Sequence, residues 1–288
     1  MPPDTPPADD AQFQYLTGQG RPHFAALLER FEADSATASA AGQRDIRYGE
    51  AARETFDFFA AQGTPRATMV YFHAGYWQSR DKSLFRFIAP AFTRAGVQVA
   101  LVNYPLCPHV SMGDLLAATR RATLAVHRHA RALPGGPLPM VAAGHSAGGH
   151  IAAELGLSDW GAHGFAIAGV LALSGVYDLA PLLGVTLNAN LGLDAASARR
   201  HSPLLRVAGG APPALFAVGG AETAAFLAQN AAMHQAWQGA GNHSQALVVA
   251  GADHFSLLDV LIDPGSALHQ QALALIAQAV GDLPREIP

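Results

Sequence analysis

A pentapeptide centred on one serine has the spacing expected of a catalytic nucleophile. Gly144-His-Ser-Ala-Gly148 ends an apolar run and fits the G-x-S-x-G pattern, in which a buried strand turns sharply into a helix. Ser146 would lie at the turn in a strained backbone conformation, with its hydroxyl projecting from the fold. Glycines two residues to either side would prevent Cβ atoms from colliding with the neighbouring strand and helix. The chain has 29 glycines, so the spacing alone is a weak signal and the surrounding elements must support it.

The composition indicates a globular chain with no electrostatic sign of a polyanionic partner. Its 288 residues are 50% hydrophobic and 14% charged, with a formal net charge of -4. We therefore expect a small neutral or aromatic substrate, and neither a nucleic acid nor a membrane as partner. The single cysteine, Cys107, is typical of a core residue, and no spacing predicts a metal or a cofactor. The chain starts without a signal peptide, which predicts a cytoplasmic protein, and a homodimer is one oligomeric state left open.

Short apolar runs alternate with helix-length stretches along most of the chain. Residues 1–12 predict a disordered tail, the spacing from Phe24 to Phe31 predicts a short helix, and segments 45–48 and 54–58 predict a strand pair. The later apolar runs are 67–73, 97–103, 139–144, 167–173, 214–219 and 246–250, and the helix-length stretches are 82–94, 112–132, 149–157, 223–238 and 266–280. Runs that are apolar on both faces are typical of a central, mostly parallel sheet. Residues 13–288 are thus predicted to form one α/β domain with helices on both faces of the sheet.

An irregular segment, residues 174–210, interrupts this alternation with Pro, Gly and Asn. Loops of this length inside a compact domain are usually functional, so we interpret the segment as a small lid over the site. Its apolar side chains would then build a pocket for neutral substrates; they include Leu182, Leu183, Leu187 and Leu191.

Two residues that could activate Ser146 follow the last two predicted strands. Ligands of such sheets bind beyond the carboxyl ends of the strands, where Glu222 and His254 are found. Serine, acid and histidine in this chain order are expected of an α/β-hydrolase. His254 would take the serine proton, and Glu222 would fix the imidazole tautomer and stabilise the imidazolium. Asp178 follows the preceding strand and could replace Glu222 as the acid; otherwise it is a turn or lid-anchoring residue.

A serine hydrolase also needs N–H donors for the oxyanion of its tetrahedral intermediate. The backbone N–H of Ala147 and those of the loop after His73 could supply them. His73 is predicted to anchor that loop. His145 and His150 could be either buried structural hydrogen-bonding residues or substrate contacts, and Asp253 is interpreted as a turn residue.

The chain resembles the kynurenine formamidase (arylformamidase) family of α/β-hydrolases over about residues 48–259. The segments that carry the resemblance are His73-Ala-Gly-Tyr-Trp77, Gly144-His-Ser-Ala-Gly-Gly-His150, Ser174-Gly-Val-Tyr-Asp-Leu-Ala-Pro-Leu182, Val218-Gly-Gly-Ala-Glu222 and Ala252-Asp-His-Phe255. The serine turn and the loop after His73 are shared with esterases and lipases at large. The tryptophan that ends the loop and the Tyr-Asp-Leu-x-Pro-Leu stretch are narrower signals.

The resemblance implies cleavage of the formyl amide of an N-formyl arylamine, such as N-formylkynurenine, through an acyl-enzyme. It implies a triad of Ser146, Glu222 and His254, and an oxyanion hole of Gly75, Tyr76 and Ala147. Tyr76 and Trp77 would suit an aromatic leaving group. The chain departs from the family at Ala74, where a glycine is usual, at Glu222, where many members have aspartate, and in its N-terminal segment.

Two other functions fit the same residues. The first keeps the chemistry and changes the substrate: a small-acyl carboxylesterase, or an amide or carbamate hydrolase for an aromatic compound. The second is a protein that has the hydrolase fold but only binds a ligand. The intact set of serine, acid and histidine argues against this function.

Overall fold

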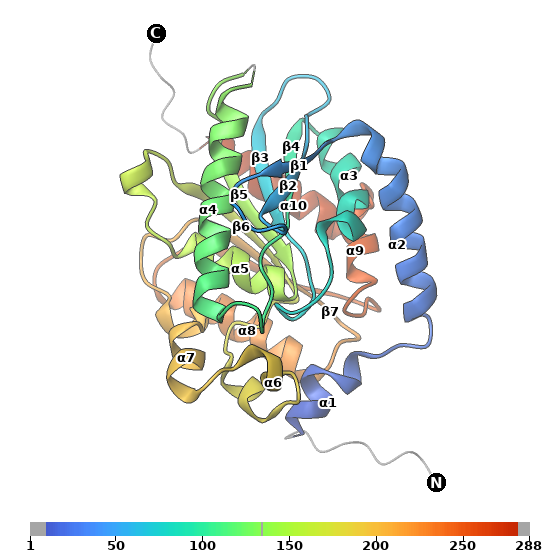
Figure 1. Cartoon of the computed structure of the whole chain (residues 1–288), viewed down its shortest axis with the longest axis vertical. Helices are drawn as coiled ribbons and strands as arrows, with labels where there is room; N and C mark the ends of the chain where they lie inside the picture. The colour runs from blue at the N-terminus through green and yellow to red at the C-terminus, as the bar shows by residue number, and fades with distance from the viewer. Residues whose placement is uncertain (1–9, 134, 282–288) are drawn as a thin grey trace.

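The computed structural model describes residues 10–133 and 135–281, and an eight-stranded sheet forms its centre (Figure 1). The strands are β1 (Gln43–Arg47), β2 (Thr55–Phe59), β3 (Ala67–Phe72), β4 (Val97–Val102), β5 (Met140–His145), β6 (Ile167–Leu173), β7 (Ala214–Gly219) and β8 (Ser244–Val249). Their order in the sheet is β1-β2-β4-β3-β5-β6-β7-β8. Strands β3 to β8 are parallel, whereas β2 pairs antiparallel with both of its neighbours, β1 and β4. The predicted mostly parallel sheet is confirmed.

Helices cover both faces of this sheet, as predicted. The larger ones are α2 (Phe24–Ala38), α4 (Met112–Arg131), α5 (Ala147–Gly156), α8 (Ala224–Gly239) and α10 (Ala267–Gly281). Helices α4, α5 and α8 pack on one face, against side chains such as Phe72 and Phe216. Helices α2 and α10 pack on the other face, where Tyr71 and Leu215 belong to a second cluster. Neighbouring residues of one strand thus enter opposite cores, which explains why the central strands are largely apolar on both faces.

Some elements of the sheet and its helices differ from the predictions. Strand β8 is an edge strand with half-exposed side chains, and Val248 is 57% exposed, so the prediction that it is buried on both faces is wrong. The predicted helix 82–94 is a 3-10 helix, η3 (Lys82–Ile88), followed by the short α3 (Ala89–Thr93) with a proline at its start. A further short helix, α9 (Leu257–Ile262), lies where no helix was expected.

The N-terminal segment is ordered closer to the start of the chain than the composition indicated. Of the predicted tail, residues 1–9 lie outside the described residues. Helix α1 (Ala11–Tyr15) begins inside it, and the Asp10 side chain caps this helix by accepting a hydrogen bond from the N–H of Phe13 at 3.1 Å. The 3-10 helix η1 (Thr17–Gln19) follows, and the helix predicted around Phe24 to Phe31 extends to Ala38. In the described ranges, no helix combines the length and the apolar character that crossing a membrane requires.

The irregular segment 174–210 folds into short helices against the body. These are η5 (Ala180–Gly184), α6 (Asn188–Leu191), α7 (Ala195–Arg200) and η6 (Pro203–Arg206). Figure 1 shows α6 and α7 at the same end of the molecule as α1. The Gln12 side chain joins the two parts, because it donates to Thr186 Oγ1 at 3.0 Å and accepts from the Thr186 N–H at 2.9 Å.

Candidate active site

Ser146 lies at a sharp turn between β5 and α5. Its backbone has φ 58° and ψ -118°, a combination that non-glycine residues rarely adopt, and its N–H donates to the carbonyl of Leu173 on β6 at 2.8 Å. Backbone strain of this kind costs about 1–3 kcal/mol and persists only where the surroundings enforce it. Because α5 begins at Ala147, the serine stands directly before the N-terminus of a helix.

The glycines on either side of Ser146 allow two backbone segments to pass at close range. A Cβ atom on Gly148 would lie 1.8 Å from the carbonyl oxygen of Phe72, at the end of β3. A Cβ atom on Gly144 would lie 2.2 Å from the carbonyl oxygen of Gly148. Both obstacles are backbone atoms, which cannot rotate away as a side chain can. The spacing around Ser146 is therefore a steric requirement of this turn.

We expect Gly148→Ala to lower the free energy of unfolding by about 3 kcal/mol, because the added methyl group collides with backbone. Gly239→Ala is the matched control: nothing lies within 4 Å of a Cβ at this last residue of α8. There the same change removes the conformational freedom of a helical glycine and stabilises by about 0.5–1 kcal/mol. Urea unfolding of both variants measures the two effects. Equal stabilities of the two variants would contradict the steric account.

The structure brings Glu222, and not Asp178, against His254. Nδ1 of His254 lies 2.6 Å from Oε2 of Glu222, and both side chains are buried. The other carboxylate oxygen, Oε1, accepts hydrogen bonds from Ser174 Oγ at 2.5 Å and from the N–H of Gly219 at 2.8 Å. The carboxylate is thus held in one orientation, with Oε2 directed at the imidazole. A histidine held at Nδ1 in this way has Nε2 left for proton transfer.

Asp178 has different partners. Its Oδ1 accepts hydrogen bonds from the N–H of Ala180 at 3.0 Å and from Ser202 Oγ at 3.4 Å. Its backbone is held through Gln229, whose Oε1 accepts the Asp178 N–H at 2.8 Å. These contacts are those of an aspartate that anchors the start of segment 174–210.

Three backbone N–H groups near Ser146 were predicted to be oxyanion donors. They belong to Gly75, Tyr76 and Ala147. In the described part of the chain none of them donates to a backbone or side-chain acceptor. The Gly75 carbonyl fixes its loop by accepting from the N–H groups of Gln78 and Ser79, each at 3.0 Å. Gly75 has φ +134°, and a Cβ there would lie 2.2 Å from the Ser79 carbonyl oxygen, so this position requires glycine.

A cavity of about 230 Å³ contains Ser146 and His254 in its wall. Its remaining lining residues are Leu16, Gln19, Gly20, Phe24, Gly75, Tyr76, Ser79, Arg80 and Phe255. None of these residues belongs to segment 174–210, so the expectation that this segment covers the site with its leucines is wrong for this cavity. Leu182 and Leu191 are buried in the core instead. The N-terminal segment provides the wall that the lid was expected to provide.

Contacts with the body hold this N-terminal segment in place. Thr223, next to Glu222, donates from Oγ1 to the Gln14 carbonyl at 2.6 Å and accepts from Gln19 Nε2 at 2.8 Å. The Tyr15 hydroxyl accepts from Gln229 Nε2 at 2.9 Å, and the Tyr76 hydroxyl donates to the Tyr15 carbonyl. Residues near the start of the chain are thus fixed directly beside Glu222.

The two aromatic residues predicted to contact the substrate have different positions. Tyr76 lines the cavity, whereas Trp77 is fully buried and donates from Nε1 to Nδ1 of His150 at 3.2 Å. The predicted substrate contact of Trp77 is therefore wrong. Nε2 of His150 in turn donates to the His201 carbonyl at 2.7 Å, which makes His150 a buried hydrogen-bonding residue. Ala74, the departure in the loop, is buried in the second core cluster.

Comparisons with known proteins agree with this geometry. A family model described as the α/β hydrolase fold matches residues 69–258. A kynurenine formamidase of Danio rerio is 30% identical over 244 residues, which are 82% of each chain. The chain belongs to the kynurenine formamidase family of α/β-hydrolases. A kynurenine formamidase of Salmo salar is 28% identical, again over 82% of each chain. A solved structure of a provisionally named thioesterase from Silicibacter is 30% identical, with a TM-score of 0.77 over 93% of this chain and 97% of the other.

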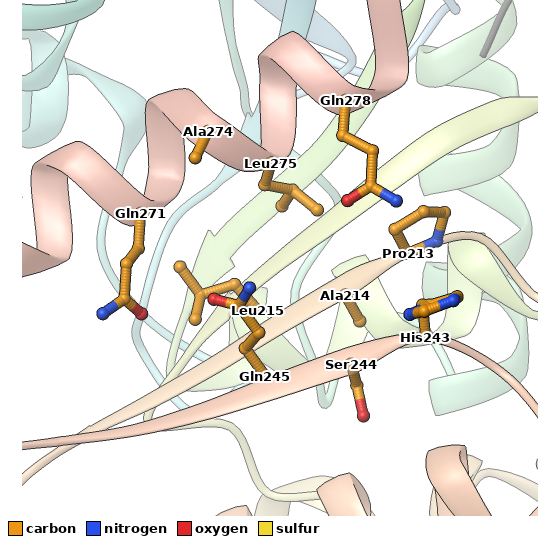
Figure 2. Close-up of a pocket in the computed structure, with 10 residues that line it drawn as sticks. All are labelled: Pro213, Ala214, Leu215, His243, Ser244, Gln245, Gln271, Ala274, Leu275 and Gln278. Atoms are coloured by element: carbon orange, nitrogen blue, oxygen red, sulfur yellow. The ribbon is translucent and has the colours of Figure 1, made fainter. Parts of the chain in front are cut away.

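A second depression lies at the opposite end of the strands in this family member. It is formed by α10 and the starts of β7 and β8, and three glutamines, Gln245, Gln271 and Gln278, line it (Figure 2). In Figure 2 the Ser244 side chain points away from α10. Its hydroxyl lies 2.9 Å from Nδ1 of His234 on α8. No carboxylate lines this depression, which therefore lacks the third member of a triad.

Several buried histidines of this hydrolase are held neutral. Burial lowers the pKa of His73 to about 4 and that of His150 to about 3, and it also lowers the pKa of His145, which packs beside His254 with ring centroids 4.6 Å apart. At His150 the Trp77 N–H occupies Nδ1, where an added proton would have to sit.

His73 anchors its loop as predicted, because Nδ1 donates to the Ala74 carbonyl at 2.7 Å.

These shifts predict a loss of stability in mild acid. Histidines in the unfolded chain have a pKa near 6.5, whereas the buried histidines of the folded protein stay neutral until a lower pH. Between pH 6.5 and about 4 the unfolded state therefore binds more protons than the folded state, and the free energy of unfolding falls as the pH drops. Each such group contributes up to about 1.4 kcal/mol per pH unit. Urea unfolding between pH 7 and pH 5 measures the slope. His150→Gln, which can keep both hydrogen bonds, should reduce the slope by about one proton; an unchanged slope would contradict the assignment.

Proposed function

We propose that this hydrolase cleaves the formyl amide of N-formyl arylamines, N-formylkynurenine among them. The observation that carries the proposal is the arrangement of the Glu222–His254 pair and the strained Ser146 around one cavity. The formyl amide is supported by the kynurenine formamidases of Danio rerio and Salmo salar, which share most of their length with this chain. Aromatic side chains in the cavity wall, Phe24, Tyr76 and Phe255, provide surfaces for an arylamine.

In the proposed mechanism Ser146 is the nucleophile. His254 takes the hydroxyl proton at Nε2 as Oγ attacks the formyl carbon, and Glu222 stabilises the imidazolium through Nδ1. The oxyanion accepts hydrogen bonds from the N–H groups of Gly75, Tyr76 and Ala147, each worth about 3 kcal/mol in the transition state. His254 then protonates the departing arylamine. Water, activated by the same histidine, attacks the formyl-enzyme and releases formate.

One observation favours a second candidate, a thioesterase with the same residues. The Silicibacter protein covers 93% of this chain at 30% identity and carries that provisional name. The triad attacks thioesters and esters by the same steps, so only the acyl group and the leaving group distinguish the two functions.

A kinetic panel tests the choice of substrate. We expect the highest kcat/KM for N-formylkynurenine when it is compared with formanilide, p-nitrophenyl acetate and an aromatic acetyl thioester. A protein that leaves both formamides intact while it cleaves the ester or the thioester is not a formamidase, although the serine mechanism would stand. Cleavage of none of the four would contradict both candidate functions.

A further inference from the structure

Arg80 places a positive charge in the wall of the cavity that contains Ser146. Its guanidinium carbon lies 5.1 Å from the centre of the Phe255 ring and 5.6 Å from that of the Phe24 ring. Among the described residues no carboxylate pairs with this guanidinium. Half-buried arginines elsewhere differ in this respect: Arg86 faces Asp57 at 2.6 Å, and Arg53 faces Asp81 at 3.3 Å.

The backbone fixes Arg80 in this position. Its φ is +71°, in the left-handed region that disfavours side-chain-bearing residues, and its carbonyl accepts a hydrogen bond from Arg53 at 2.8 Å. Burial lowers the pKa of the guanidinium, with no neighbouring acid to oppose the shift. An arginine nevertheless stays charged at any pH at which the protein works. The cavity therefore holds a permanent cation, and within residues 10–133 and 135–281 no side chain or carbonyl accepts a hydrogen bond from its guanidinium.

We propose that Arg80 is the subsite for a carboxylate on the leaving group of the substrate. This inference rests on the proposed function and narrows its substrate class to acylated aromatic compounds that carry an acid group. The substrate would then be aromatic and negatively charged, whereas the composition led us to expect a small neutral or aromatic one. The guanidinium can bind a carboxylate through two parallel hydrogen bonds, while its faces stay against the two phenylalanine rings.

Phe255 relates this subsite to the reacting centre. Its ring lies 5.1 Å from the His254 ring and 5.1 Å from the guanidinium carbon of Arg80. Phe24 packs on the same ring, with centroids 4.8 Å apart. A substrate whose carbonyl is at Ser146 therefore extends its leaving group along Phe255 toward Arg80. N-formylkynurenine has such a shape, since its amino-acid carboxylate lies beyond the aryl ring that bears the formamide.

The preference for an acid over a neutral isostere tests this assignment. We measure the ratio of kcat/KM for two pairs, N-formylkynurenine against its carboxamide and 4-acetoxybenzoate against 4-acetoxybenzamide. The ratio should fall by about 10- to 100-fold in Arg80→Gln, chiefly through KM, because a charge-assisted hydrogen bond is lost. Arg80→Lys keeps the charge and should keep part of the preference. The matched control is Arg120→Gln, in which an arginine 4.7 Å from the Trp160 ring is changed outside the cavity; there the ratio should stay as in the wild type.

The two pairs separate this inference from the proposed function. If neither formamide is cleaved but the ester pair shows the Arg80-dependent ratio, the formamidase function fails and the carboxylate subsite stands. If the formamides are cleaved and Arg80→Gln slows acid and carboxamide equally, Arg80 only supports the cavity wall and the inference is overturned. A wild type without preference for the acid in either pair overturns it as well.

Discussion

Ser146→Ala is expected to lower kcat/KM by about 10⁴- to 10⁶-fold on every substrate that the protein cleaves. The change removes the only atom that can form the acyl-enzyme in the proposed mechanism. It leaves the oxyanion donors and the cavity in place, so a small residual rate above that in water remains. Initial rates with the best substrate of the panel measure the loss.

The structure also predicts that the Ser146→Ala variant folds as stably as the wild type, so the expected loss of activity would not come from unfolding. Alanine and serine are equally strained at φ 58°, and the Ser146 N–H keeps its bond to Leu173 in the variant. Thermal unfolding should therefore match that of the wild type. Ser158→Ala is the matched control, because its hydroxyl donates to the Glu154 carbonyl at 2.7 Å outside the cavity. A Ser146→Ala variant with the activity of this control would show that another nucleophile acts.

Glu222→Gln is expected to reduce kcat by about 10⁴-fold. The reason is that the variant favours the His254 tautomer that carries its proton on Nε2, the nitrogen that has to accept the serine proton. The Gly219 N–H donates to Oε1 at 2.8 Å, so the amide oxygen would keep that position and the amide nitrogen would face His254. That nitrogen donates to Nδ1, and the imidazole proton then moves to Nε2. A histidine with a proton on Nε2 cannot accept one from Ser146.

Asp178→Asn is the matched control among the carboxylates. The amide oxygen of asparagine can still accept the hydrogen bonds that Asp178 Oδ1 accepts from Ala180 and Ser202. We expect kcat within about threefold of the wild type, since the variant loses no contact with His254. Measured kcat values for both variants decide between the two acids. A large loss in Asp178→Asn together with a small one in Glu222→Gln would assign the role to Asp178.

The sheet could be predicted because its interior imposes one simple rule on the sequence. Strands such as β3 and β5 are buried on both faces, so nearly every residue is apolar or small and the run is visible without a structure. Strand β8 is not buried in this way because it lies at the edge of the sheet, where it has a neighbouring strand on one side only. The short α9 gives too little periodicity to be recognised as a helix.

The residues of the proposed mechanism were also visible in the sequence, whereas the walls of the cavity were not. Ser146 and His254 follow strand ends, and the fold places all strand ends of a parallel sheet at one edge. Glu222 and Asp178 both satisfied that criterion, and it is the 2.6 Å contact of Glu222 with Nδ1 of His254 in the structure that distinguishes them. The N-terminal wall depends on bonds such as that of Thr223 to Gln14, between residues 209 positions apart. Contacts between residues so far apart produce no periodic pattern in the sequence. The position of the Arg80 side chain in the cavity wall could not be recognised in the sequence either.

Labelling with a fluorophosphonate probe, followed by peptide mapping, tests the central claim of an activated Ser146 most directly. The strained serine beside the Glu222–His254 pair should react in the folded protein, with loss of hydrolytic activity in proportion to labelling. We predict one modified peptide, that containing Ser146, and no labelling of Ser146→Ala. An active wild-type protein that does not react, or that carries the label on a different serine, would contradict the account.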